Sequence, residues 1–585
     1  MAFIPSESPN ILVKEYDLSG VVPGVTTSTG AFLGDFNWGP IDQPVLVSNE
    51  AELVNTFGSP ALLNDSSVID YISANSFLKY SANMYVTRAS TAIAANAYDS
   101  DAGAVSILVK NDEDWLTKKS GAVAGSHTFI AKHAGAAGSG LEIAICGHCD
   151  SIVGDSDFNN WAYSGSFDGR PGTSAFVSAL SADSAVAYDE VHVAVIDADG
   201  KFTGVPGTVV ETYPYVSLAT NAKGPEGSTN FVVDVINNKS EFVRCAQMPN
   251  DYTPATAAAF TAAANGTANI AAPTSVSLVG GVNSATLTPG AFITAASVYE
   301  DPDIIQVDFL IAPSLPTKDD QVTVVNALTG IASALRKDCV VVTSPNRDSV
   351  INNAPSSIVT DTVAFGNALN ASSYLIVDNN FLKVYDKYND QYVYIPAAPS
   401  TAGVMALTDD VSAPWFSPAG SRRGQYYGVA SLAYSPTKAQ RDTLYKAGIN
   451  PIVNLPGQGV LLYGDKTKLG RPSAFDRINV RRLFLGVERA IKAAAQNVMF
   501  EFNDEFTRAE FVNIIEPFLR EIKGRRGITD FRVVCDETNN TSSVIDSNQF
   551  VASVFIKPAR SINYVTLNFV AVRTGVDFDE VVGLV

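Results

Sequence analysis

Two thiols and an imidazole lie within four residues in the stretch Cys146-Gly-His-Cys149, the most metal-like pattern in the chain. A structural zinc site takes four ligands, usually from two spaced pairs. The other cysteines are Cys245, Cys339 and Cys535, and none of them brings a second pair. We therefore expect a thiol pair within a β-rich region here, and no metal site.

Outside one central stretch, the chain has no histidine that could act as a general base. The four histidines, His127, His133, His148 and His192, all lie in one central stretch. A Ser-His-Asp or Cys-His arrangement elsewhere is therefore not expected. No Gly-x-Gly-x-x-Gly follows a strand pattern and no Walker loop is present, so the sequence has no nucleotide fingerprint. We expect no catalytic residue and no cofactor.

Composition excludes further classes of protein. The formal net charge of −20 over 585 residues argues against a direct nucleic-acid binder. The first residues have neither a basic nor an apolar leader region, and no window of eighteen residues is entirely apolar, so we expect no secretory signal and no membrane insertion. Five thinly spread cysteines fit a reducing compartment.

Positive charge gathers locally in this acidic chain. Residues 471–526 hold eleven Lys or Arg against eight Asp or Glu. A long predicted helix at 473–500 carries the basic residues Arg477, Arg481, Arg482, Arg489 and Lys492. Such residues often form only a solvated helix face with intrahelical pairs. The alternative is a docking face for an acidic partner. In that case, reversing the charge of these basic residues would weaken docking and leave the folding of the chain in solution intact.

Both ends of the chain have β-prone segments. The C-terminal segment either folds back into its own domain or adds a strand to a neighbouring molecule, and the N-terminal segment is either a frayed terminus or an arm that pairs. Residues 559–585 are rich in β-branched and aromatic side chains and have no glycine or proline from Ser561 to Thr574, which predicts a long strand. Residues 1–21 carry two early prolines and then a short apolar patch, which predicts an extended arm. The residues expected to pair with other subunits are Ile11, Leu12, Val13, Val570, Val572, Val576 and Phe578.

Strand and helix patterns alternate in two separate stretches, residues 22–88 and 299–430, which predicts one doubly wound parallel sheet. In the first stretch, Ser48 is expected to cap a helix. Glu52 follows four positions later, an arrangement close to a capping box, in which the spacing is three. Between the two stretches, strands are expected at HTFIAKHAG, LEIAIC, VHVAVIDADG and TNFVVDVI.

These patterns predict an α/β and α+β multidomain protein. The expected parts are an N-terminal arm (1–21) that joins and completes the C-terminal domain, a split α/β domain (22–88 plus 299–430), an inserted, mostly-β outer domain (89–298), a compact C-terminal α+β core domain (431–569) and a C-terminal arm (570–585).

Several long motifs, in order, resemble the tail sheath proteins of contractile-tailed (myovirus) bacteriophages. They are AFLGDFNWGPIDQPVLVSNEAELVNTFGSP (31–60), YDKYNDQYVYIPAAPSTAGVMALTDD (385–410), PWFSPAGSRRGQ (414–425), QRDTLYKAGINPI (440–452), YGDKT (463–467), FDRINVRRLF (475–484), FRVVCDETNNT (531–541) and FVASVFIKPARSINYVTLNFVAVRTGVDFDE (550–580).

The resemblance implies a subunit of stacked hexameric rings around a tail tube, joined by terminal arms that add strands to neighbouring subunits. It implies contraction that drives the tube through the host envelope for genome delivery. The implied partners are other copies, the tail tube protein, and the baseplate and tail terminator proteins, in the virion tail after assembly in the host cytoplasm. The basic helix would then face the tube.

The sequence differs from the resembled family in one respect, and two other functions are possible interpretations of the same motifs and patterns. The largest members of the resembled family carry two inserted domains, whereas only about 210 residues separate the two α/β stretches here, so we expect the outermost one to be missing or vestigial. The sheath of a related injection machine, of bacteriocin or secretion type, would fit the same motifs. A cofactor-using α/β enzyme is the alternative from another class, and a thermal shift with NAD or ATP would support it.

Overall fold

The computed structural model contains two compact units. It describes residues 28–60, 65–99, 106–119, 127–148, 156–180, 187–249, 252–260, 272–284 and 286–562. Within these residues, the larger unit comprises 28–414 and 418–489, and the smaller unit comprises 415–417 and 490–562. Residues 431–489, which the sequence patterns place with the C-terminal domain, therefore belong to the larger unit.

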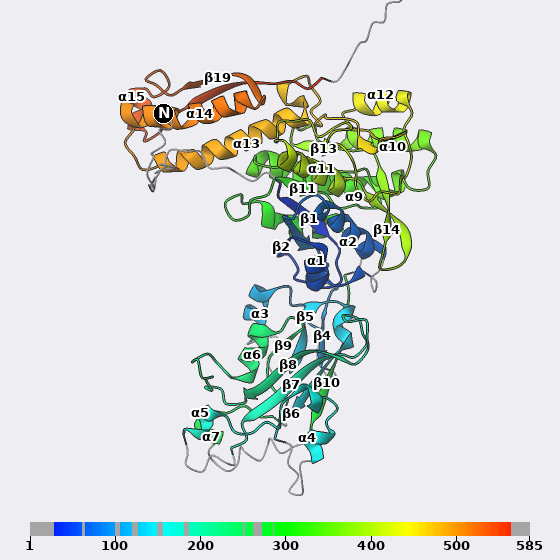
Figure 1. Cartoon of the computed structure of the whole chain (residues 1–585), viewed down its shortest axis with the longest axis vertical. Coiled ribbons are helices and arrows are strands. Elements are labelled where there is room, and N and C mark those ends of the chain that lie inside the picture. The colour runs from blue at the N-terminus through cyan, green and yellow to red at the C-terminus, as the bar shows by residue number, and fades with distance from the viewer. Residues whose placement is uncertain are drawn as a thin grey trace, which may run out of the picture. The chain divides into compact units, whose positions relative to one another are not determined.

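A six-stranded sheet organises the larger unit, with strand order β13-β12-β11-β1-β3-β2 (Figure 1). Five of its strands run parallel, and only β2 at the edge pairs antiparallel. The strands are β1 (Gly30–Gly34), β2 (Pro44–Val47), β3 (Met84–Arg88), β11 (Phe309–Ile311), β12 (Val340–Thr343) and β13 (Leu375–Val377). Strands from two distant stretches of sequence thus share one sheet, and the predicted doubly wound arrangement is confirmed.

Both faces of this sheet are covered by helices. Alternate side chains of each strand point to opposite faces, so each strand contributes to two apolar clusters. Phe309 and Ile311 enter one apolar cluster, whereas Leu310 enters the other. The first cluster includes side chains of α2 (Asp65–Leu78) and α11 (Ala398–Val411). The second includes side chains of α8 (Pro289–Ala296), α9 (Lys318–Gly330) and α10 (Pro355–Ala368). Burial on both faces explains the continuous apolar runs of the central strands.

Helix α1 (Glu50–Phe57) begins one residue later than the sequence predicts. Its N-cap is Asn49, whose side chain accepts a hydrogen bond from the Glu52 backbone N–H, and not Ser48. Ser48 instead donates its backbone N–H and its hydroxyl to the Glu52 carboxylate. Both residues contribute to the start of the helix, since an asparagine cap satisfies the first-turn donors as well as a serine does.

An antiparallel seven-stranded sheet, with order β8-β7-β6-β10-β4-β5-β9, lies in the sequence between the two halves of the first sheet. Its strands are β4 (Asn96–Asp99), β5 (Phe129–Ala134), β6 (Leu141–Cys146), β7 (Glu190–Asp197), β8 (Thr208–Ser217), β9 (Val243–Cys245) and β10 (Thr274–Val279). Short helices accompany it: α3 (Asp112–Lys118), α4 (Ser156–Asn160), α5 (Ala175–Ser178), α6 (Val232–Lys239) and α7 (Ala257–Phe260).

The strand expected at TNFVVDVI is wrong, because the last five of these residues, Val232–Ile236, lie in α6. Val232, Val233, Val235 and Ile236 are all buried in the core of the seven-stranded sheet. β-Branched residues favour strands only weakly, and burial on one face of a helix outweighs that preference here. The other three strands expected in this region are confirmed as β5, β6 and β7.

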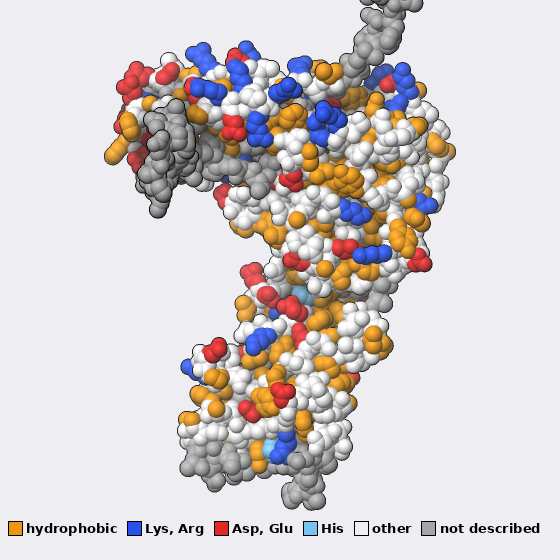
Figure 2. All heavy atoms as spheres, viewed as in Figure 1, with side chains coloured by type: hydrophobic (Ala, Val, Ile, Leu, Met, Phe, Trp, Pro, Cys, Tyr) orange, Lys and Arg blue, Asp and Glu red, His pale blue; other side chains and the backbone are white. Residues whose placement is uncertain are grey.

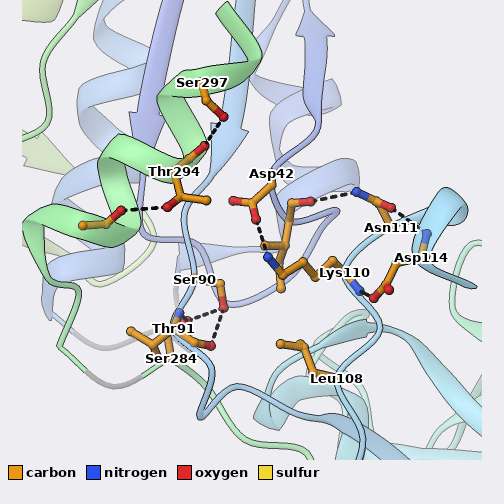
Figure 3. A network of polar contacts seen from close by, with 12 residues as sticks. Asp42, Ser90, Thr91, Leu108, Lys110, Asn111, Asp114, Ser284, Thr294 and Ser297 are labelled. Carbon is orange, nitrogen blue, oxygen red and sulfur yellow. Dashed lines mark hydrogen bonds and ion pairs between the residues drawn. The ribbon is translucent and has the colours of Figure 1, made fainter. Parts of the chain in front are cut away.

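The loop between β1 and β2 joins the two sheets of the larger unit. Lys110 pairs with Asp42 at 2.7 Å, and Asn111 donates to the backbone carbonyl of Ile41 at 3.3 Å (Figure 3). Where the chain passes between the sheets, the hydroxyls of Ser90 and Ser284 lie 2.9 Å apart. The connection therefore consists of side-chain contacts in addition to the two chain crossings.

Smaller elements complete the larger unit. A three-stranded sheet has order β15-β14-β16, and a hairpin pairs β17 with β18. Their bounds are β14 (Phe381–Asp386), β15 (Gln391–Pro396), β16 (Ser431–Leu432), β17 (Ile452–Leu455) and β18 (Gly459–Leu462), and the helix α12 (Lys438–Lys446) lies between β16 and β17 in the sequence.

The smaller unit contains two long helices and a hairpin-like pair of strands. Helix α13 (Ile478–Ala495) ends within it, and α14 (Glu505–Gly524), β19 (Ile528–Val534), α15 (Ser542–Asp546) and β20 (Ser553–Pro558) follow. The helix predicted at 473–500 is confirmed over Ile478–Ala495. In the described part of the chain, no helix combines the length and apolar character needed to cross a membrane.

Candidate assembly surfaces

The two-stranded sheet of the smaller unit is the first candidate site. Strands β19 and β20 pair antiparallel, from Ile528 opposite Pro558 to Val534 opposite Ser553. Among the described residues no third strand joins this sheet, so both of its outer edges present backbone N–H and C=O groups. Because an isolated pair of strands is marginally stable, the geometry favours completion of this sheet by further strands.

Helix α14 supports the sheet on one side. Its buried side chains Phe511, Ile515, Leu519 and Ile522 recur at helical spacing, and the Phe511 ring lies 5.3 Å from that of Phe550. On β20, Phe555 points outward and is 60% exposed. One face of the sheet is therefore packed, whereas apolar surface remains uncovered on β20.

The residues predicted to pair with other subunits cannot be placed. Ile11, Leu12, Val13, Val570, Val572, Val576 and Phe578 lie outside the described residues. Their pairing remains a prediction.

The basic residues predicted to line a docking face lie on or just before α13, and most of them turn inward. Arg482 forms an ion pair with Asp409 of α11 in which both side chains are buried. Arg489 contacts Asp308 at 2.6 Å and donates to the Asp338 carbonyl at 2.9 Å. These contacts fasten the helix to the body of the larger unit.

Arg477 and Arg481 are also engaged within the chain. Arg481 donates to the Ser373 hydroxyl at 2.6 Å, and its guanidinium lies 4.3 Å from the centre of the Tyr374 ring. Arg477 pairs with Asp465 at 2.8 Å. Only Lys492 of the predicted set is classed as exposed.

Burial therefore corrects the expectation that Arg481 and Arg482 present charge to a partner. It also contradicts the expectation that charge reversal there leaves folding intact, because Arg482→Glu would bury a carboxylate beside Asp409. One signal in the sequence points inward: Arg482, Leu485 and Arg489 share a helix face, and Leu485 is a core residue. Contact of the helix with a tail tube remains a prediction.

The Cys-Gly-His-Cys stretch follows β6. Cys146 is buried, and Cys149 lies outside the described residues. His148 Nδ1 lies 2.9 Å from the Pro171 carbonyl oxygen, and its ring stacks on Tyr188 at 3.7 Å. No group of three metal-ligating side chains occurs in the portion of the chain that the structure describes.

A buried carboxyl group lies at the end of β13. Asp378 accepts hydrogen bonds from Ser344 Oγ at 3.0 Å, Thr401 Oγ1 at 3.2 Å and the Asn380 backbone N–H at 3.3 Å. Burial raises the pKa of Asp378 to about 7, although these hydrogen bonds lower it in part. None of these three donors carries a positive charge that would offset the burial. The Asp378 carboxyl therefore titrates at a higher pH in the folded chain than in the unfolded one, which makes stability depend on pH.

Comparison with known proteins identifies the family. Residues 295–468 match the family model of the phage tail sheath protein central domain, and residues 471–571 match that of the phage tail sheath C-terminal domain. The chain is 34% identical over 678 residues to the tail sheath protein of Enterobacteria phage T4, covering 99% of each chain. It is 32% identical over 671 residues to that of Vibrio phage KVP40, covering 98% of this chain and 99% of the relative.

Among solved structures, the crystal structure of the sheath tail protein Lin1278 from Listeria innocua has the same fold. Its TM-score is 0.52 at 12% identity, over 92% of this chain and 96% of that one. The alignments to both phage proteins are longer than the 585 residues of this chain, so those relatives carry residues without a counterpart here. The absence of the outermost inserted domain remains a prediction. The chain belongs to the phage tail sheath protein family.

Proposed function

We propose that this chain is the subunit of a contractile tail sheath. Copies stack as hexameric rings around a tail tube, and contraction drives the tube through the host envelope for genome delivery. The partners are other copies, the tail tube protein, and the baseplate and tail terminator proteins. The protein acts in the virion tail after assembly in the host cytoplasm, and its role is structural and not enzymatic.

The observation that carries this proposal is the β19–β20 sheet, which no third strand joins among residues 28–562 as far as they are described, in a member of the sheath family. The N-terminal arm (1–21) and the C-terminal arm (570–585) supply the missing strands between copies, so the smaller unit is completed only on assembly. A ten-residue strand offers about ten backbone hydrogen bonds to one edge, since each of about five residues uses both its N–H and its C=O there, and each bond is worth about 1 kcal/mol net. A few such strands stabilise a mesh while remaining reversible during assembly.

Strand addition also permits contraction without dissociation. Arms joined to rigid bodies can hinge, so the bodies reorient while the backbone pairing persists. The free energy for contraction then comes from a metastable lattice of subunits that relaxes to a better-packed one, so no nucleotide hydrolysis is needed. Lys492 is the part of the predicted basic helix set that remains exposed for a tube contact, whereas the arginines stabilise the subunit itself.

A proline substitution in the C-terminal arm tests the strand addition. Val572→Pro removes a backbone donor and should prevent tube formation by folded subunits, because proline interrupts a β ladder. Val572→Thr keeps both the donor and the β preference, and should assemble normally. Electron microscopy of purified protein measures the yield of tubes. Equal yields from both variants would show that this part of the arm does not bind as a strand.

A further inference from the structure

An exposed aromatic loop separates α13 from α14 in the smaller unit. Phe500 is completely exposed, Phe502 is 84% exposed and Phe506 is 76% exposed. Met499 is also exposed beside them. Scattered apolar residues are normal on a protein surface, but four in eight positions form a patch of the kind that marks an interaction site.

This loop is held in place by polar contacts. Asn503 donates to the Gln549 carbonyl at 2.8 Å and accepts from Arg508 Nη1 at 3.0 Å. Asp504 caps α14 by accepting from the Thr507 backbone N–H at 2.8 Å. Phe500 has a φ of 71°, a left-handed conformation that costs free energy for a bulky residue. The fold thus maintains an unfavourable conformation with the aromatic rings directed to solvent.

The two ends of α14 differ in charge. The aromatic loop carries Glu501, Asp504 and Glu505. The other end of the helix carries the exposed basic residues Arg520, Lys523, Arg525 and Arg526. Figure 2 shows acidic side chains gathered around the end of this unit that carries α15, and basic side chains over the stretch of α14 and β19.

Aromatic rings accompany the basic end. The Arg525 guanidinium lies 5.1 Å from the centre of the Trp415 ring, and the Lys523 ammonium lies 5.9 Å from that of Phe531. Cations of this kind attract further aromatic faces as well as carboxylates. The basic end is therefore complementary to the aromatic loop in both its charge and its ring chemistry.

We propose that the aromatic loop of one copy docks on the basic end of α14 in a second copy. This head-to-tail contact rests on the proposed sheath function and names a second interface between subunits, separate from the terminal arms. The rings of Phe500 and Phe502 pack on the guanidinium groups, while Glu501 and Glu505 pair with them.

The contact must join two molecules. A helix of 20 residues is about 30 Å long, so the two ends of α14 cannot meet within one copy. An interface between two different patches is heterologous, and repetition of such a contact generates closed rings or helical filaments. Both outcomes suit a sheath subunit.

Paired charge reversals test the proposal. One variant reverses the loop (Glu501→Lys with Glu505→Lys), and a second reverses the basic end (Arg520→Glu with Arg526→Glu). Each alone should lower the yield of tubes at least tenfold, while the monomer keeps its melting temperature to within a few degrees. The variant that carries all four changes should recover most of the yield, because the complementary charges have exchanged places.

A second pair of variants tests whether a loss of tube yield is specific to the aromatic loop or follows from any change of an exposed apolar residue. Phe500→Ser with Phe502→Ser should lower the tube yield at least tenfold, whereas Leu116→Ser, at an exposed apolar position on α3, should not change it. Unchanged yields for the loop variants, or a four-residue variant that stays as defective as its parents, would overturn the proposal. If the unaltered protein forms no tubes under any condition, the proposed sheath function fails instead.

Discussion

At the scale of single residues, buried charges hold α13 on the core of the larger unit. Arg482 and Arg489 connect α13 with Asp409 and Asp308, which belong to distant stretches of the sequence. Neither arginine can leave its carboxylate without leaving a buried, uncompensated charge. Their role is thus to fix the part of α13 that belongs to the larger unit.

A double-mutant cycle tests this role. Arg482→Met should lower the free energy of unfolding by about 3–5 kcal/mol, because Asp409 stays buried without its cation. Arg482→Met combined with Asp409→Leu should recover most of that loss. Chemical denaturation of monomers measures both. As the control, Arg520→Met removes only an exposed pair with Glu516 and should cost less than about 1 kcal/mol. Additive losses in the double variant would argue against a buried pair.

Asp378 makes the stability depend on pH. Because its pKa is about 7 in the folded chain and 3.8 as the ordinary value, the folded state retains a proton between these limits that the unfolded state releases. This contribution is fully present below pH 3.8 and is lost as the pH rises through 7.

Asp378→Asn should therefore raise the free energy of unfolding at pH 8 by roughly 2–4 kcal/mol, with little change at pH 4. Denaturation curves of the two monomers across this range give the difference. A difference that stays constant with pH would mean that the Asp378 carboxyl does not titrate in this window.

At the scale of elements, the loop between β1 and β2 couples the two sheets of the larger unit. Trp38 belongs to this loop, yet it is buried in the apolar core of the seven-stranded sheet. Its ring lies 4.9 Å from that of Phe202 and 5.1 Å from that of His133. The seven-stranded sheet thus obtains part of its core from the stretch that also forms the parallel sheet.

Trp38→Ala should destabilise the seven-stranded sheet by about 3–5 kcal/mol, because it leaves a large cavity in that core. Hydrogen exchange should accelerate in β5 and β7 and remain slow in β11 and β12. Leu116→Ala, on the exposed surface of α3, serves as the control. Equal acceleration in both sheets would show that they unfold as one cooperative unit.

The elements differ in how well the sequence predicts them. The short β-branched runs of β11, β12 and β13 alternate with periodic helices, and this pattern alone predicts the parallel sheet. The same β-branched chemistry is misleading in α6, because packing against the seven-stranded sheet decides its conformation. The inward direction of Arg481 and Arg482 depends on partners more than 70 residues away in the chain, which no local pattern reveals.

At the scale of the whole molecule, we propose that the subunit is complete only in an assembly. The larger unit has two covered faces on its parallel sheet. In the smaller unit, the described residues form a two-stranded sheet without a third strand, and an exposed aromatic loop. A net charge of −20 keeps separate copies soluble until they assemble. In the proposed sheath, assembly would depend on backbone pairing at the sheet edges and on the head-to-tail contact of α14.

The central claim is that strands from other copies complete the β19–β20 sheet. A helical reconstruction of assembled tubes by electron cryomicroscopy, at a resolution that traces the backbone, tests it most directly. We expect residues 10–13 and 570–578 of neighbouring copies to lie in register beside β19 and β20. A map in which both ends of each chain pair only within their own subunit would contradict it.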